Sequence, residues 1–576
     1  MASRPTPKQQ NSGRAFPCAL GTLGFRRGAF FILVLVGEVG WFLWSPHSFL
    51  QPASASTPPK VRVTISKETT YITEPLRPDG YPDYLAALNQ RLAQGVTPEN
   101  NAAVLFWQAM GPKPIEEKIR EEYFRRLGLQ PLPDQGHYFQ PFEEYAASIS
   151  KQAGQELSSE QIAQMYHQAM EGPWKAEQFP LVAQWLQANE KPLALLIEAS
   201  RRPRRYEPLV VGQPEENQPE MLLAVLLPAA GQMREVARTF RIRAMYRLGQ
   251  GKTAEAWEDL LTIHRLARLM GQGPTLVENL VAASMEYLAC QADQVVAAEG
   301  NLSAQQALGF RDALSALPPL PPMADKIDLG ERFMYLDVVC TLARGIKPSS
   351  RLFELLDGGP GQTPEWAKRL GDFLASVGQA MIDWDVVLRM GNQWYDRLVE
   401  AGRKPTSAQR RQAVETIEHQ IRQLAEKIKN PMGLVVGVLA APRQKISQQI
   451  GEMLVALVVP ALSAVYVAED RAAMYRQLSV CSFALAAYRA EQGKYPERLA
   501  DLVPRYLAAV PADVFAQDRP VIYRRTEEGL ILYSVGPNGR DDGGRSSDDI
   551  SPEGQAQGDD LVVRMKSPTA PRPKQK

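Results

Sequence analysis

The chain has 576 residues, of which 45% are hydrophobic, and its 65 basic residues nearly balance its 64 acidic ones. This length suits about two to four domains with a large core. The formal net charge of +1 leaves no excess positive charge with which to bind a nucleic-acid backbone or an anionic surface. We therefore expect no nucleic-acid partner.

An apolar run near the N-terminus, residues 28–44 (GAFFILVLVGEVGWFLW), is interrupted only by Glu38. The run is just long enough to span a bilayer as a helix. Trp41 and Trp44 lie at its far end, where tryptophan suits a membrane interface. Basic residues before the run favour a cytoplasmic N-terminus, and these are Arg4, Lys8, Arg14, Arg26 and Arg27.

Three interpretations of this run compete. The leading one is an uncleaved signal-anchor that holds the rest of the chain outside the cytoplasm, so the lipid bilayer is an expected partner through residues 28–44. A cleaved signal peptide is the second, because Ala53-Ser54-Ala55 offers a small-residue cleavage site. A buried helix is the third, and Glu38 favours it because a carboxyl group within a membrane span is costly.

Four cysteines occur, at positions 18, 290, 340 and 481. The last three are far apart and each lies in an apolar helical context. We therefore predict buried free thiols rather than a disulfide framework. No Cys-x-x-Cys pair occurs, which argues against a zinc ribbon or a thioredoxin-like site.

From Asp79 to Gln492 the spacing of apolar residues is helical. Thr97 followed by Pro98 predicts a helix start. Residues 317–322 (LPPLPP) form a rigid connector and a candidate boundary. The apolar runs 432–441 and 453–468 are interpreted as buried helices, since both are short for a membrane span.

An internal repeat links residues 221–229 with 453–461, and residues 246–252 with 488–494. It predicts a repeated unit of a helix, a glycine cap and a second helix that packs back on the first. The alternative is that Gln-Gly-Lys is only a common turn. Residues 238–270 also resemble a tetratricopeptide-type hairpin.

The pattern changes to β near the C-terminus. Residues 521–525 and 530–534 predict two strands joined by a glycine-containing turn, and residues 559–565 predict a third. A Gly/Asp/Ser-rich loop lies between the second and third strands.

Residues 486–564 resemble the head of the major pseudopilin of type II secretion systems. The pattern is carried by Tyr488 to Pro496 (YRAEQGKYP), Leu507 to Pro511, Asp513-Val514-Phe515 and Tyr533 to Gly539 (YSVGPNG). The whole layout is also similar to a family of uncharacterised bacterial membrane-anchored proteins. These resemblances imply a bacterial inner-membrane protein with its bulk in the periplasm, and a role linked to secretion.

The pseudopilin resemblance further implies a calcium ion in the loop after the hairpin. By position, Asp541, Asp542, Asp548 and Asp549 are the calcium candidates. Calcium prefers six to eight hard oxygen ligands, which four aspartates and loop carbonyls can supply. The alternative is a merely hydrated loop, because Arg540 stands where an EF-hand needs a ligand.

The chain departs from pseudopilins at its N-terminus. Gly24-Phe25 is present, but Ala29 stands where the glutamate of the processing motif is expected. Pseudopilins also join their membrane segment directly to the head by one continuous helix, whereas this chain inserts several hundred residues.

The expected fold is mainly α, with a transmembrane helix, a body of antiparallel helical hairpins and a small antiparallel β element that gives an α+β head. The expected segments are a cytoplasmic tail (1–27), the transmembrane helix (28–44), a linker (45–70), a helical body with the tetratricopeptide-like hairpin (71–320), a helical segment (321–430), a segment repeating residues 221–260 (431–512), the pseudopilin-like head (513–565) and a tail (566–576).

The sequence offers no catalytic residues. Gly251-Lys252-Thr253 ends like a phosphate-binding loop, but Tyr246 replaces the required glycine. His264 is expected to be a partly buried helix residue, and the basic run 201–205 a solvated loop. The leading hypothesis is therefore a non-catalytic extracytoplasmic scaffold with an unknown protein partner. The alternatives are a hydrolase-like enzyme whose carboxylates converge in the fold, and a divergent pseudopilus subunit.

Overall fold

The computed structural model describes residues 61–154, 157–211, 221–225, 227–345, 381–428, 442–459, 462–551 and 554–566. Within these residues the chain is mainly helical, with a small antiparallel sheet near the C-terminus, as predicted. The expected tail (1–27) and transmembrane helix (28–44) lie outside the described residues. Among the helices of the described part, none combines the length and apolarity that a bilayer crossing requires.

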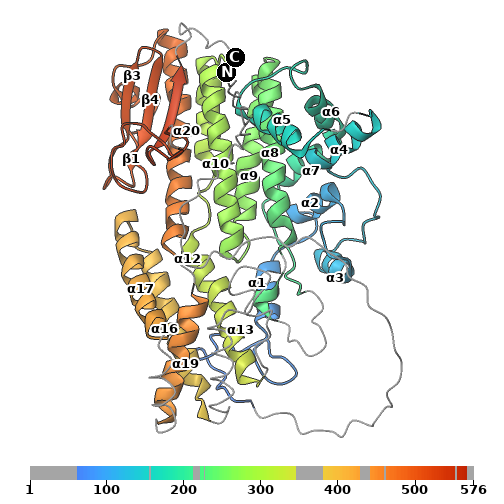
Figure 1. Cartoon of the computed structure of the whole chain (residues 1–576), viewed down its shortest axis with the longest axis vertical. Helices are drawn as coiled ribbons and strands as arrows, with labels where there is room; N and C mark the ends of the chain where they lie inside the picture. The colour runs from blue at the N-terminus through green and yellow to red at the C-terminus, as the bar shows by residue number, and fades with distance from the viewer. Residues whose placement is uncertain are drawn as a thin grey trace, which may run out of the picture.

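The molecule is elongated, and its longest helices run side by side along its long axis (Figure 1). The N-terminal helices are α1 (Tyr84–Ala93), α2 (Ala102–Met110), α3 (Glu117–Leu127), α4 (Phe142–Gln152), α5 (Ser159–Glu171), α6 (Pro180–Ala188), α7 (Glu190–Ser200) and the short η1 (Leu222–Ala224). The central helices are α8 (Pro228–Gly249), α9 (Thr253–Met270), α10 (Leu276–Glu299) and α11 (Ala304–Ala316). The later helices are α12 (Met323–Lys326), the π-helical η2 (Ile327–Glu331), α13 (Arg332–Ala343), α16 (Trp384–Gly402), α17 (Ser407–Ile428), α19 (Arg443–Val458), α20 (Ser463–Gln492) and the short η4 (Leu499–Leu502).

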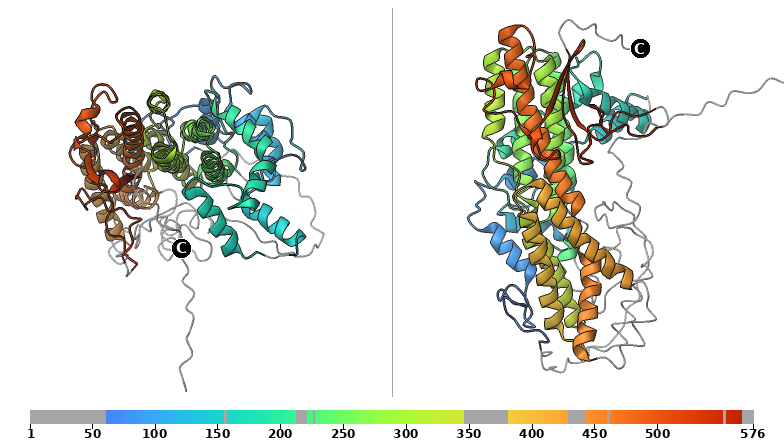
Figure 2. Two further views of the ribbon diagram at one scale, coloured as in Figure 1. Left: turned by 90° about the horizontal axis from the view of Figure 1, so that it is seen from above. Right: turned by 90° about the vertical axis from the view of Figure 1, so that its left-hand side faces the viewer.

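Two hydrophobic cores hold these helices together. The first core surrounds α8, α9 and α10, with α2 to α7 on one side and α20 and the sheet on the other (Figures 1 and 2). Fully buried Phe240, Ile263 and Ala289 belong to it. The second core lies at the other end of the molecule, among α1, α13, α16, α17 and α19, and contains Tyr335 and Leu388. Most of these helices therefore bury their apolar faces in one of the two cores, whereas α10 and α20 contribute residues to both.

The proline-rich connector 317–322 lies where the first core gives way to the second, between α11 and α12. Arg268 Nε donates to the Pro318 carbonyl at 2.8 Å, and Arg476 Nη2 donates to the Leu317 carbonyl. These bonds fix the connector against α9 and α20. The long helix α20 spans the same boundary, since Tyr466 packs in the second core and Leu485 in the first. The two cores are thus tied together by a continuous helix.

The aligned glycines of the internal repeat adopt the same conformation. Gly251 follows α8 with φ of 76°, and Gly493 caps α20 with φ of 73°. Both lie in the left-handed region that glycine occupies without steric cost. Different structure follows each of them, because α9 packs back along α8 whereas η4 and the strands follow α20.

The C-terminal strands form a three-stranded antiparallel sheet in the order β3 (Ile522–Thr526), β4 (Gly529–Ser534) and β5 (Leu561–Lys566). Thr526 pairs with Gly529 across the predicted turn, and Ser534 pairs with Leu561. A separate pair, β1 (Ala512–Asp513) and β2 (Arg519–Pro520), precedes the sheet. Leu532 and Val563 are fully buried in the first core, where the sheet contacts α10 and α20. The sheet is therefore an integral part of the helical body.

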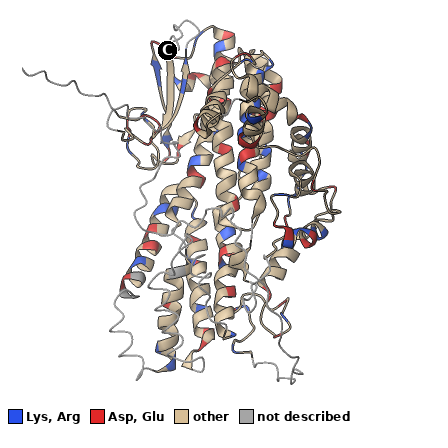
Figure 3. Ribbon diagram, turned by 45° about the vertical axis from the view of Figure 1, so that its right-hand side comes forward, with Lys and Arg blue, Asp and Glu red and all other residues tan. Residues whose placement is uncertain are grey.

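Charged residues of both signs are interspersed along the helices of the described part of the chain (Figure 3). Many of them are paired between elements, such as Arg243 with the fully buried Asp259 and Arg410 with Asp470. The three described cysteines, Cys290, Cys340 and Cys481, are buried and unpaired. The prediction of buried free thiols is confirmed for these three.

Candidate functional site

The loop between β4 and β5 separates the four calcium candidates from one another. The Asp541 carboxylate accepts from Tyr533 Oη at 2.9 Å and pairs with Arg524 at 3.2 Å. Asp549 pairs with Arg564 at 2.6 Å. Asp548 is exposed. Arginines therefore neutralise Asp541 and Asp549, and only Asp542 of the predicted set joins a carboxylate cluster.

That cluster consists of Asp542, Asp559 and Asp560, with one carboxylate oxygen from each residue lying within 4.8 Å of the others. Backbone amides hold the three groups in place. Asp560 accepts from Gly544 N at 2.7 Å and from Asp542 N at 3.3 Å. Asp542 accepts from Asp559 N at 3.0 Å, and Asp559 accepts from Asn538 N at 3.0 Å. We call this cluster the head-loop site.

Two glycines let the backbone fold tightly around the head-loop site. Gly536 has φ of 67°, and a Cβ there would collide with the Asp559 carbonyl. A Cβ at Gly558 would collide with the Arg545 carbonyl and the Asp542 side chain. One carboxylate oxygen, Asp559 Oδ1, is buried without a hydrogen-bond partner. Buried polar atoms are normally satisfied, so this oxygen fits a cation ligand.

Electrostatics at the head-loop site also favour a cation. Burial and the neighbouring Asp542 charge raise the pKa of Asp560 to about 6. Burial, with the same neighbour, raises the pKa of Asp559. Crowded carboxylates resist ionisation unless a cation neutralises them. The residues present therefore fit the calcium ion that the pseudopilin resemblance implies, with Asp542, Asp559 and Asp560 as its carboxylate ligands.

The sequence analysis did not identify Asp559 and Asp560 as calcium candidates, because both fall within residues 559–565, which predict the third strand. The two adjacent aspartates directly before β5 could have indicated the site, since β5 returns beside the loop that contains Asp542. The Asp-x-aromatic element has a different role. Fully buried Asp513 accepts from Phe515 N, Ser534 Oγ and Val535 N at 2.8–2.9 Å, which ties β1 to the end of β4.

A second polar cluster lies inside the first core. His264, on α9, is fully buried rather than partly buried as predicted. Its Nδ1 lies 2.8 Å from the Glu286 carboxylate and its Nε2 lies 3.0 Å from Asp293, both on α10. Arg268 contacts both Glu286 oxygens, at 2.6 and 2.9 Å. These four groups form a charge-balanced network between two helices.

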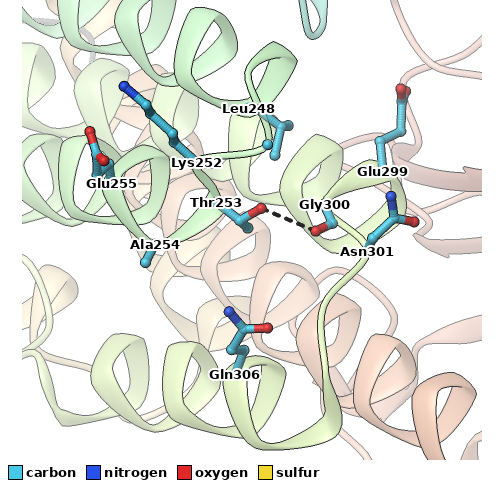
Figure 4. Close-up of a pocket in the computed structure, with 10 residues that line it drawn as sticks. Leu248, Lys252, Thr253, Ala254, Glu255, Glu299, Gly300, Asn301 and Gln306 are labelled. Atoms are coloured by element: carbon cyan, nitrogen blue, oxygen red, sulfur yellow. Dashed lines mark hydrogen bonds between the residues drawn. The ribbon is translucent and has the colours of Figure 1, made fainter.

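An open hollow of about 450 Å³ lies where the α8–α9 turn meets the α10–α11 turn (Figure 4). Lys252, Thr253, Asn301 and Gln306 line it. Thr253 Oγ1 donates to the Gly300 carbonyl at 3.2 Å and so joins the two turns. The Gly251-Lys252-Thr253 sequence thus belongs to a helix–helix turn and contributes to packing there.

A smaller hollow of about 330 Å³, the junction pocket, lies between the two cores. Lys326 Nζ donates to the Gly273 carbonyl at 2.7 Å, and burial lowers the pKa of this amine. Asp325 and Asp328 both contact Arg403 Nη2 at 3.2 Å. The π-helical η2 forms part of the wall, and such segments occur often at functional sites.

Comparison with known proteins gives no relative, since the chain matches no family model, no curated protein and no solved structure.

Proposed function

We propose that this chain is a membrane-anchored, extracytoplasmic helical scaffold that binds a protein partner and carries a calcium-stabilised, pseudopilin-like head. The anchor is the apolar run 28–44, with the N-terminus in the cytoplasm and the bulk of the chain in the periplasm of a bacterium. The observation that carries the proposal is the head-loop site, where Asp542, Asp559 and Asp560 converge within 4.8 Å.

The position of this site supports its assignment. It lies in the loop where the resemblance to pseudopilins implies calcium, and it joins that loop to the start of β5. Arg524 neutralises Asp541 and Arg564 neutralises Asp549. Among the residues that the structure describes, no arginine forms an ion pair with Asp542, Asp559 or Asp560. A divalent cation bound there would close the loop and hold the head surface in one conformation.

The environment of α20 favours a scaffold over a pseudopilus subunit. In pseudopilins, the helix before the head continues directly from the membrane segment. Here α20 is buried on α10, α11 and α17, with Leu478, Phe483 and Leu485 fully enclosed. Exposing this helix to a fibre would cost about 1.5–3 kcal/mol for each large apolar side chain. The buried helix therefore belongs to the body of the protein.

The second candidate function, a hydrolase-like enzyme with converging carboxylates, would use the junction pocket. Asp325 and Asp328 do meet there, on Arg403. The same arginine neutralises both, however, and Arg332 also contacts Asp328 at 2.9 Å. An acid–base pair needs two carboxyl groups in different protonation states, so this arrangement favours binding over hydrolysis.

Thermal unfolding of the full-length chain in detergent tests the proposed function. Saturating calcium should raise the unfolding temperature relative to EGTA, because ligand at about 100 times its Kd stabilises by about 2.7 kcal/mol. Asp560→Asn should abolish the calcium-induced shift, whereas Asp548→Asn, which removes an exposed loop charge, should leave it unchanged. No calcium-induced shift in the unchanged protein would remove the basis for the proposal.

Partner binding and location need a separate experiment. Crosslinking in intact cells, followed by purification from membranes and mass spectrometry, should recover one dominant envelope protein in the presence of calcium. A C-terminal tag should be digested by protease added to spheroplasts. A tag that stays protected while the protein fractionates as free cytosolic material would overturn the proposed topology.

A further inference from the structure

The structure assigns a second metal site, independent of the head. We propose that His264, Cys290 and Asp293 bind one zinc ion in the first core, between α9 and α10. One ligand atom from each residue lies within 4.8 Å of the other two, and all three side chains are fully buried. Cys290 and Asp293 are three residues apart on α10, so they share one face of that helix.

The mixture of ligand atoms selects the metal. An imidazole nitrogen, a thiol sulfur and a carboxylate oxygen suit zinc, whereas calcium and magnesium prefer oxygen alone. His264 Nε2 and Asp293 Oδ2 lie 3.0 Å apart. Two ligands about 2.1 Å from a tetrahedral zinc ion are about 3.4 Å apart. A displacement of a few tenths of an ångström would therefore admit the ion.

The imidazole is held for metal binding by its other nitrogen. His264 Nδ1 lies 2.8 Å from the Glu286 carboxylate. Donation of that N–H to Glu286 would leave the lone pair of Nε2 available to the metal once the Nε2 proton is released. A carboxylate in this position is typical of zinc-bound histidines, where it fixes the tautomer and the ring orientation. Arg268 in turn holds both oxygens of Glu286.

An unsatisfied atom also points to a ligand. Asp293 Oδ1 is buried and has no hydrogen-bond partner, although Asp293 is fully enclosed. A buried acceptor left without a partner is destabilising. Coordination of a metal by the Asp293 carboxylate would remove that cost. Ser479, on α20, donates to the Cys290 carbonyl at 3.2 Å, which places α20 beside the site.

Zinc binding would keep the interior neutral. Without metal, a doubly protonated His264 and Arg268 balance Glu286 and Asp293. Binding releases one proton from His264 and one from the Cys290 thiol, so the divalent ion replaces two positive protons. The net charge of the buried cluster is zero in both states, and no oxidant or reductant takes part. The exchange therefore leaves no uncompensated charge in the core, which would be costly.

The three ligands are fully buried, so a substrate would not reach the ion and we expect a structural role. Three protein ligands leave the fourth tetrahedral position for a buried water. The ion would join α9 and α10 next to α20, in the part of the core on which the head packs. Entry of the ion would require local opening, so we expect it to be acquired during folding and exchanged slowly.

Metal content of the full-length chain tests the proposal. The protein should be purified through an affinity tag that contains no histidine, washed with EGTA, and measured by inductively coupled plasma mass spectrometry. We expect about one zinc per chain, and less than about a tenth of that in Cys290→Ser. Cys340→Ser, which alters a buried thiol in the second core, should retain the full content. Zinc bound at the head-loop site would survive Cys290→Ser and would be lost in Asp560→Asn.

A second measurement covers the case in which Cys290→Ser fails to fold. A variant that keeps Cys290 as its only cysteine should be produced in cobalt-supplemented cells. It should show a thiolate-to-cobalt charge-transfer band and tetrahedral d–d bands. Zinc-free unchanged protein, full zinc content in folded Cys290→Ser, or a cobalt spectrum without the thiolate band would each overturn the proposal.

Discussion

The guanidinium of Arg205 contacts the carboxylate of Glu278 at 3.2 Å, and the two side chains are only 1% and 3% exposed. Glu207 lies 3.0 Å from the same guanidinium. Arg205 thereby joins the segment after α7 to the start of α10. The predicted solvated loop at 201–205 is therefore wrong for Arg205, which is an interior ion-pair partner, whereas Arg201 and Arg204 are exposed as predicted.

This relationship predicts unequal effects within the run. Arg205→Ala should lower the free energy of unfolding by about 3–5 kcal/mol, because Glu207 and Glu278 remain buried without their cation. Arg201→Ala should change it by less than about 1 kcal/mol, since the Arg201–Glu258 pair is largely exposed. Urea denaturation of the two variants measures the difference, and equal effects would show that Arg205 is not buried.

The helical segments and the C-terminal hairpin could be predicted from the sequence, because each depends on local patterns of residues. The strand prediction for 530–534 is confirmed by β4, and the helical period around Tyr84 is confirmed by α1. The start of α2 was not predicted, since Asn101 and not Thr97 caps it by accepting from Ala103 N. Both residues are good caps, and the tertiary contact of Asn101 with Tyr206 decides between them.

The sites were less predictable because long-range contacts assemble them. Asp542 and Asp560 meet only when β5 pairs with β4, and Asp560 then receives the amides of Asp542 and Gly544. The buried network of His264, Arg268, Glu286 and Asp293 comes from α9 and α10. No periodic pattern in the sequence specifies that these two helices pack together. Glu286 and Asp293 are seven residues apart in the sequence, which places them on one face of a helix. Their shared partner, His264, could not be identified from the sequence.

Asp337 should make stability depend on pH. Burial raises the pKa of this carboxyl to about 6, despite a hydrogen bond from Leu222 N and an ion pair with Arg77. The folded-state pKa lies above the unfolded value of about 3.9. The contribution to stability is therefore complete below pH 3.9 and is lost as pH rises through about 6.

Asp337→Asn tests this pH dependence. The variant should gain stability relative to the unchanged chain between pH 4 and pH 8, by about 1–3 kcal/mol. Asp312→Asn, which removes an exposed charge from α11, serves as the matched control. Thermal unfolding across the pH range measures both. A stability difference for Asp337→Asn that does not grow with pH would contradict the burial of Asp337.

Two helical glycines should respond in opposite ways to alanine. A Cβ at Gly391, on α16, would collide with the ring of buried Tyr335, so Gly391→Ala should destabilise by about 1–3 kcal/mol. Gly309, on α11, has no neighbouring atom within 4 Å of a Cβ. Gly309→Ala should stabilise by about 0.5–1 kcal/mol through its helix propensity. Unfolding temperatures that move in the same direction for both variants would contradict the packing of α13 against α16.

Calorimetric titration of calcium into the full-length chain is the most direct test of the head-loop site. We expect one calcium per chain, with binding lost in both Asp542→Asn and Asp560→Asn and retained in Asp548→Asn. Absence of calcium binding at millimolar concentration, or binding that survives Asp560→Asn but requires Asp548, would contradict the assignment of Asp542, Asp559 and Asp560 as the ligands.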